Sequence, residues 1–82
     1  MVIRLRVRRS SSGRVQLVNL YNEDMLFIVN DRPYRVEPNK TVQLDGLPSG
    51  SLTYIVQSET WGRRASRTTT LQPNETLTLT AR

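Results

Sequence analysis

The nine residues Val36-Glu37-Pro38-Asn39-Lys40-Thr41-Val42-Gln43-Leu44 recur further along the chain as a second copy of the same pattern, Leu71-Gln72-Pro73-Asn74-Glu75-Thr76-Leu77-Thr78-Leu79. In each copy a Pro-Asn pair separates flanks in which apolar and polar residues alternate. Proline presets φ for the second position of a β-turn, and asparagine tolerates the positive φ that a type II turn requires at the third. The pattern therefore predicts strand, tight turn and strand twice, with Asn39 and Asn74 at positive φ.

Between the start of the chain and the first Pro-Asn pair, the sequence predicts further strands. Met25-Leu26-Phe27-Ile28-Val29 is an apolar run short enough for a strand covered on both faces at the centre of the core. Asn30-Asp31, directly after it, fits a two-residue hairpin with both residues at positive φ. Over residues 15–20 the alternation changes parity at Val18, which predicts a bulge or a strand buried on both faces.

No segment has the apolar period of 3.6 residues that an amphipathic helix requires, so the fold class is all-β. The number and spacing of strands predict one domain over residues 1–82, a small antiparallel β-sandwich of seven or eight strands or a small barrel. Strands are expected at 2–8, 15–20, 25–29, 33–36, 41–44, 52–56, 66–71 and 76–81, with connections at 45–50 and 58–64. The expected core is Ile3, Leu5, Val15, Leu17, Phe27, Val29, Val36, Val42, Leu44, Leu52, Tyr54, Val56, Leu77 and Leu79.

The stretch Leu47-Pro48-Ser49-Gly50, the strand 52–56 after it and the turn at Pro73-Asn74 together carry a family resemblance. This run resembles the L-P-x-G-x-x-x-Y-x-V … L-x-P-G-E-T sequence of small immunoglobulin-like and prealbumin-like β-sandwich modules, over residues 19–80. Asn39 and Asn74 stand where the family usually has glycine. Such modules are common accessory domains of bacterial surface and secreted proteins, so the resemblance implies a domain that binds or spaces its neighbours without catalysis.

The composition removes most catalytic chemistry. The 82 residues include no cysteine and no histidine, and therefore no thiolate nucleophile, no imidazole base and no thiolate or imidazole metal ligand. Ser10, Ser11 and Ser12 have no basic partner to activate a hydroxyl, and Glu23, Asp24 and Asp31 lack the spacing of a calcium loop. We expect no enzyme activity, no metal site and no cofactor.

The net charge of +5 is unevenly distributed, with +5 on residues 1–20, −3 on residues 21–60 and +3 on residues 61–82. Arginines alternate along the first predicted strand, and the only tryptophan is followed by Gly-Arg-Arg. Arginine and tryptophan are the residues that dominate binding hot spots, and arginine suits bidentate contacts to carboxylate or phosphate. The candidate binding surface consists of Arg4, Arg6, Arg8, Arg9, Trp61, Arg63, Arg64 and Arg67.

Each of these features has a simpler interpretation. Charges on an exposed strand keep a sheet soluble and block edge-to-edge pairing, Trp61 could fold back as a lid over one end of the sandwich, and an arginine bias also arises from a GC-rich genome. Asn39-Lys40-Thr41 and Asn74-Glu75-Thr76 match the N-glycosylation pattern, but the turns already explain both asparagines.

The expected partner is another protein, either acidic or a neighbouring domain. Nucleic acid is the alternative, with arginines on phosphates and Trp61 or Tyr21 stacked on bases. No segment approaches the length of a membrane span, and Arg4 and Arg6 interrupt any apolar segment of a signal peptide. We therefore expect no membrane insertion and no export of the chain as written. A domain excised from a larger exported protein would show the same sequence features.

Overall fold

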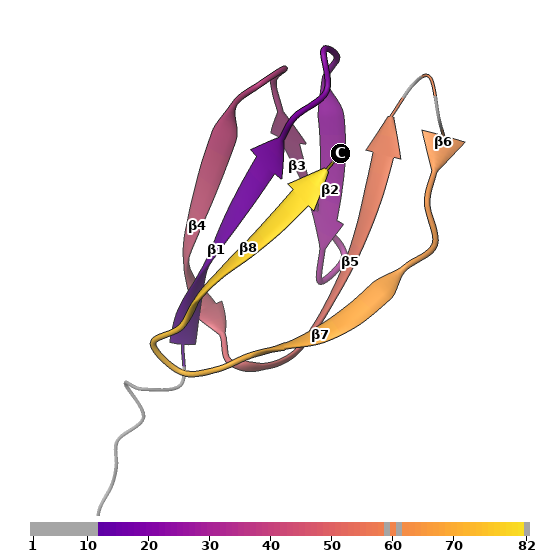
Figure 1. Ribbon diagram of the computed structural model, residues 1–82. Coiled ribbons are helices and arrows are strands. Elements are labelled where there is room, and N and C mark those ends of the chain that lie inside the picture. Colours follow the sequence, from indigo (N-terminus) through magenta and orange to yellow (C-terminus); the bar gives the residue numbers. More distant parts are fainter. Residues whose placement is uncertain (1–11, 59, 61, 82) are drawn as a thin grey trace, which may run out of the picture.

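The computed structural model describes residues 12–58, 60 and 62–81, and the regular secondary structure of these residues consists entirely of β-strands (Figure 1). The all-β prediction is confirmed. The predicted strand 2–8, with Ile3 and Leu5, lies outside the described residues. The strands are β1 Ser12–Asn19, β2 Met25–Val29, β3 Arg32–Val36, β4 Thr41–Pro48, β5 Gly50–Ser58, β6 Gly62–Arg63, β7 Arg67–Leu71 and β8 Thr76–Ala81.

These strands form two sheets, as in a small β-sandwich. The three-stranded sheet has the order β4-β1-β8; the five-stranded sheet has the order β3-β2-β5-β6, with β7 also paired to β5. The described strand pairs are antiparallel, as predicted, except for β1 and β8, which run parallel. The reason lies in the link before β8, where the Asn74 amide donates to the Ser12 carbonyl at 2.8 Å, so both strands start at the same end of the sheet.

Both repeated turns form as predicted. Asn39 and Asn74 have φ of 57° and 64°, and in each turn the fourth residue donates its amide to the carbonyl of the first at 3.1 Å. Neither turn closes a hairpin within one sheet, however. The first joins β3 to β4 and the second joins β7 to β8, so both carry the chain from the five-stranded sheet to the three-stranded one.

The hairpin prediction for β2 and β3 is also confirmed. Asn30 and Asp31 have φ of 49° and 67°, and Val29 pairs with Arg32 across the turn. Burial along β2 differs from the prediction, because Phe27 is buried whereas Leu26 and Ile28 are only half-buried. One face of β2 packs on the core, and among the described residues no further layer of strands covers the other face.

Two local predictions for β1 and β4 are wrong. Alternation along β1 continues to Asn19, whose side chain points inward, so Val18 marks no change of parity. The irregularity lies in β4, where Asp45 and Gly46 together stand opposite Arg14 and Gly46 has φ of 70°. Residues 45–48, expected in a connection, therefore continue the strand beyond a β-bulge.

The core lies between the inner faces of the two sheets, where alternate residues of β1, β2, β5 and β8 meet. Most of the predicted core is buried, but Val42, Leu44, Tyr54 and Leu77 are only half-buried against it. The buried apolar residues are Val15, Leu17, Met25, Phe27, Val29, Val36, Leu52, Val56, Leu71, Leu79 and Ala81.

A polar side chain, that of Asn19, also occupies the core. It has no exposed surface, and its Nδ2 donates to the carbonyl oxygens of Glu23, Val36 and Glu37 at 2.8, 3.0 and 3.1 Å. Its Oδ1 accepts from the Tyr21 amide at 2.8 Å. The amide of Asn19 thus ties β1 to the end of β3 in the other sheet and to the turn before β2.

We expect Asn19→Ala to lower the free energy of unfolding by roughly 3 kcal/mol or more, because it leaves several shielded backbone groups without partners. Asn19→Asp should be at least as destabilising, since a carboxylate cannot donate to three carbonyls. Urea denaturation measures both. The control is Gln16→Ala on the outer face of β1, where a change within about 0.5 kcal/mol is expected. Equal midpoints for Asn19→Ala and Gln16→Ala would contradict this role.

The positive φ of the two Pro-Asn turns leads to a second prediction. Asn39→Gly and Asn74→Gly should leave the melting temperature unchanged or raise it, because glycine adopts positive φ without steric cost. Asn→Val at either position should destabilise by about 1–2 kcal/mol, because a β-branched side chain resists that conformation. Thermal unfolding followed by circular dichroism compares the variants, and Gly and Val variants that melt together would refute the assignment.

Candidate binding surface

Of the predicted surface, the structure describes Arg63, Arg64 and Arg67. Arg63 ends β6, Arg64 follows it and Arg67 begins β7, so all three lie along one edge of the five-stranded sheet. They divide between two faces. The Arg63 side chain donates from Nε to Gln57 Oε1 at 3.0 Å on the outer face, whereas Arg64 and Arg67 line a groove. The remaining members, Arg4, Arg6, Arg8, Arg9 and Trp61, lie outside the described residues.

Arg64 reaches from this edge to the turn that follows β1. Its backbone amide donates to the Val56 carbonyl at 2.9 Å, which anchors it to β5. Its guanidinium donates to the Tyr21 hydroxyl and lies 5.5 Å from the centroid of the Tyr21 ring, within the range of a cation–π contact. Tyr21, a predicted stacking residue, is therefore engaged by an arginine of the same chain.

The groove lies between the edge of β8 and the segment that joins β6 to β7. Its volume is about 310 Å³, and its lining combines two arginines with apolar and hydroxyl side chains. Tyr54 and Val56 come from the inner face of β5, and Thr80 comes from β8. The lining residues are Tyr54, Val56, Arg64, Ala65, Arg67 and Thr80.

The arginines of this edge differ from Arg14 and Arg35 in their ion pairing with the described carboxylates. Arg14 pairs with Asp45 at 2.8 Å and Arg35 pairs with Asp24 at 3.2 Å. Within the part of the chain that the structure describes, Arg63, Arg64 and Arg67 form no ion pair with a carboxylate. Their partners among these residues are uncharged: Arg63 donates to Gln57 and Arg64 to Tyr21, so an anion that bound at this edge would not compete with a carboxylate of the described residues.

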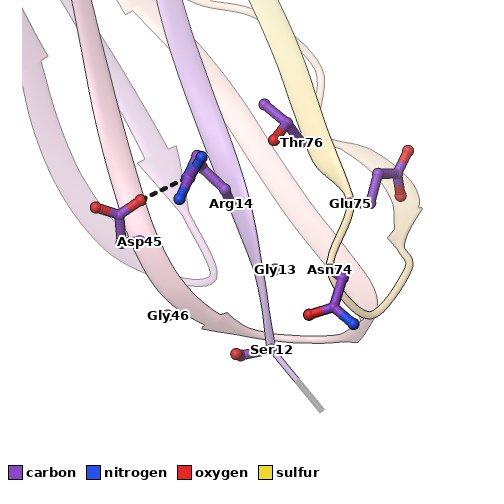
Figure 2. Close-up of a pocket in the computed structure, with 8 residues that line it drawn as sticks. All are labelled: Ser12, Gly13, Arg14, Asp45, Gly46, Asn74, Glu75 and Thr76. Carbon is purple, nitrogen blue, oxygen red and sulfur yellow. Dashed lines mark hydrogen bonds and ion pairs between the residues drawn. The ribbon is translucent and has the colours of Figure 1, made fainter. Parts of the chain in front are cut away.

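A second cleft, of about 210 Å³, lies where β1 begins, beside the bulge of β4 and the second Pro-Asn turn (Figure 2). Figure 2 shows the side chains of Arg14 and Asp45 pointing toward each other across its rim, joined by their ion pair. Gln43 Nε2 also donates to Asp45 Oδ1 at 3.2 Å. The only arginine in the lining of this cleft is thus held by Asp45, and Glu75 Oε1 accepts from the Gln72 amide at 2.7 Å, so the cleft offers an anion less than the groove does.

Sequence reasoning identifies the arginines but misses Tyr54, Val56 and Thr80 as their neighbours. The alternation of β5 assigns Tyr54 to the core, and the opening beside it exists only because β8 ends the other sheet.

Asn39, in a glycosylation pattern, donates from its side chain to Asn22 Oδ1 at 3.3 Å. Across residues 12–58, 60 and 62–81, no three acidic side chains are grouped so that they could hold a metal ion.

No protein-family model matches this sequence, and a search of curated proteins finds no significant match. The described residues include no helix that is long and apolar enough to cross a membrane.

The cleft of Figure 2 has a packing constraint that gives a prediction. A Cβ added to Gly13 would lie 2.8 Å from Leu71 Cγ and 3.0 Å from the Gln72 carbonyl oxygen. Leu71 is fully buried and Gln72 contributes backbone, so neither can move aside easily. Gly13→Ala should therefore destabilise by about 1–3 kcal/mol in urea denaturation, whereas the neighbouring control Ser12→Ala should not. A Gly13→Ala variant as stable as the wild type would show that β1 can move away from Leu71.

Proposed function

We propose that this protein is a non-catalytic β-sandwich module that acts through its surface, as a structural or protein-interaction domain of the immunoglobulin-like or prealbumin-like accessory type. The two-sheet architecture and the resemblance around residues 47–56 support the family assignment. The partner is a protein, acidic or a neighbouring domain. The candidate surface is the arginine edge, which we define as Arg63, Arg64 and Arg67.

The observation that carries this proposal is that the arginine edge forms no ion pair with any described carboxylate and lies beside a groove of mixed polarity. Rim arginines steer acidic partners and increase association rates, and a partly buried tyrosine adds contact area that needs little ordering. Tyr54 and Val56 supply that apolar contact in the groove. A protein surface combines carboxylates and apolar side chains and so matches both features.

Nucleic acid is the competing partner. The net charge of +5 attracts any polyanion, but stacking requires free aromatic faces. Arg64 already occupies the ring of Tyr21, and Tyr54 is half-buried against the core. The nucleic-acid alternative therefore depends chiefly on Trp61, which lies outside the described residues.

Two parallel selections against the whole chain test the proposal. A random peptide library should yield binders enriched in aspartate and glutamate, and a random oligonucleotide library should yield only weak, salt-sensitive binding without sequence preference. Peptide binding should fall in the charge reversal Arg63→Glu with Arg67→Glu. The matched control is Arg32→Glu with Arg35→Glu, on the β3 edge, and should bind as the wild type does.

Two outcomes would contradict the protein-interaction proposal. Oligonucleotide binding at micromolar affinity or tighter at physiological salt, weakened by about 1–3 kcal/mol in Trp61→Ala, would make nucleic acid the partner. Failure to select any peptide would also reject the protein-interaction proposal.

A further inference from the structure

The described strands leave four outer sheet edges, and these edges differ in how they are protected against pairing with another chain. Edge strands are usually blocked by proline, charge or a bulge. On β3, Pro33 removes an amide and Arg32 and Arg35 add charge. On β4, the bulge at Asp45 and Gly46 interrupts the ladder. Residues 76–81 of β8 contain no proline, no charge and no bulge.

The backbone groups that β8 presents outward follow from its pairing with β1. The carbonyls of Glu75 and Ala81 accept the amides of Arg14 and Leu20, at 2.8 and 3.0 Å. Because successive residues of a strand direct their backbone groups to opposite sides, odd-numbered residues of β8 face β1. The N–H and C=O groups of Thr76, Thr78 and Thr80 face the open edge, and no described residue pairs with them.

The open edge of β7 is shorter. Thr53 exchanges hydrogen bonds with Asn30 on the β2 side, so even-numbered residues of β5 face β7. The register then leaves only Thr68 and Thr70 of β7 with outward backbone groups. An added strand would form a longer ladder on β8 than on β7.

Arg64 and Arg67 line the groove directly beside the β8 edge, together with Thr80. We propose that β8 is a docking edge for an extended acidic segment of a partner protein, which pairs with Thr76, Thr78 and Thr80 and places carboxylates against Arg64 and Arg67. This inference rests on the proposed function and specifies its partner. Backbone hydrogen bonds give affinity in strand addition, and side-chain contacts give specificity.

The charge of the edge selects this occupant over a second copy of the chain. Among the described strands the only acidic residue is Asp45, at the bulge of β4, so no strand of another copy would bring alternating carboxylates to the arginines. In an extended segment, alternate side chains share one face at a spacing of about 6.8 Å. A segment with an acid at every second position therefore presents a row of carboxylates to the groove.

A fluorescent peptide of alternating threonine and glutamate tests the inference by anisotropy, with the threonine–lysine peptide as its charge control. The glutamate peptide should bind saturably and the lysine peptide should not. Thr78→Pro removes an outward amide without breaking the β1 ladder and should weaken binding roughly five- to ten-fold. The matched control Thr68→Pro, on the β7 edge, should bind as the wild type does. Arg67→Gln should weaken binding and Arg32→Gln should not.

Amide hydrogen exchange of the wild type gives a readout that does not depend on how the proline variants fold. Addition of the glutamate peptide should slow exchange at Thr76, Thr78 and Thr80 and leave Thr68 and Thr70 unchanged. No saturable binding, equal weakening by Thr78→Pro and Thr68→Pro, or unaltered exchange at β8 would overturn the inference. Acidic peptides from the library that bind without protecting β8 would leave the proposed function standing and refute this docking edge alone.

Discussion

The side-chain amide of Asn19 is fully buried between the two sheets. A shielded amide is tolerated only when its hydrogen-bonding groups are satisfied, and here three carbonyls and one backbone amide satisfy it. These partners belong to the turn after β1 and to the end of β3. The relative position of the sheets is thereby fixed by directional bonds, which constrain geometry more tightly than apolar contacts do.

The same strand also receives both copies of the repeated turn. β1 is the central strand of its sheet, with β4 antiparallel on one side and β8 parallel on the other. The Lys40 carbonyl at the end of the first turn accepts the Asn19 amide at 3.0 Å, and the Glu75 carbonyl after the second accepts the Arg14 amide at 2.8 Å. The two copies of the Pro-Asn turn therefore hold opposite ends of β1, the first from the β4 side and the second from the β8 side.

This arrangement leaves the sandwich with two unlike sides. The side of β3 and β4 carries a proline, a bulge and arginines at its edges. The side of β7 and β8 is rich in threonine, and beside its groove lie Arg64 and Arg67, which form no ion pair with any described carboxylate. Among the described strands, the devices that block edge pairing are therefore concentrated on the side of β3 and β4.

The sequence by itself determined most of the described strands, the hairpin at Asn30-Asp31 and both Pro-Asn turns, because each depends on local φ preferences and a two-residue period. It placed β6 and the end of β4 in connections, since pairing with distant strands decides those segments. It also singled out Arg63, Arg64 and Arg67 by residue type. Tertiary structure alone decided that the repeats cross between sheets, that β8 runs parallel to β1 and that Asn19 is buried. It also decided that Tyr54 and Thr80 join the arginines at one groove, since each of these outcomes depends on contacts between residues far apart in the chain.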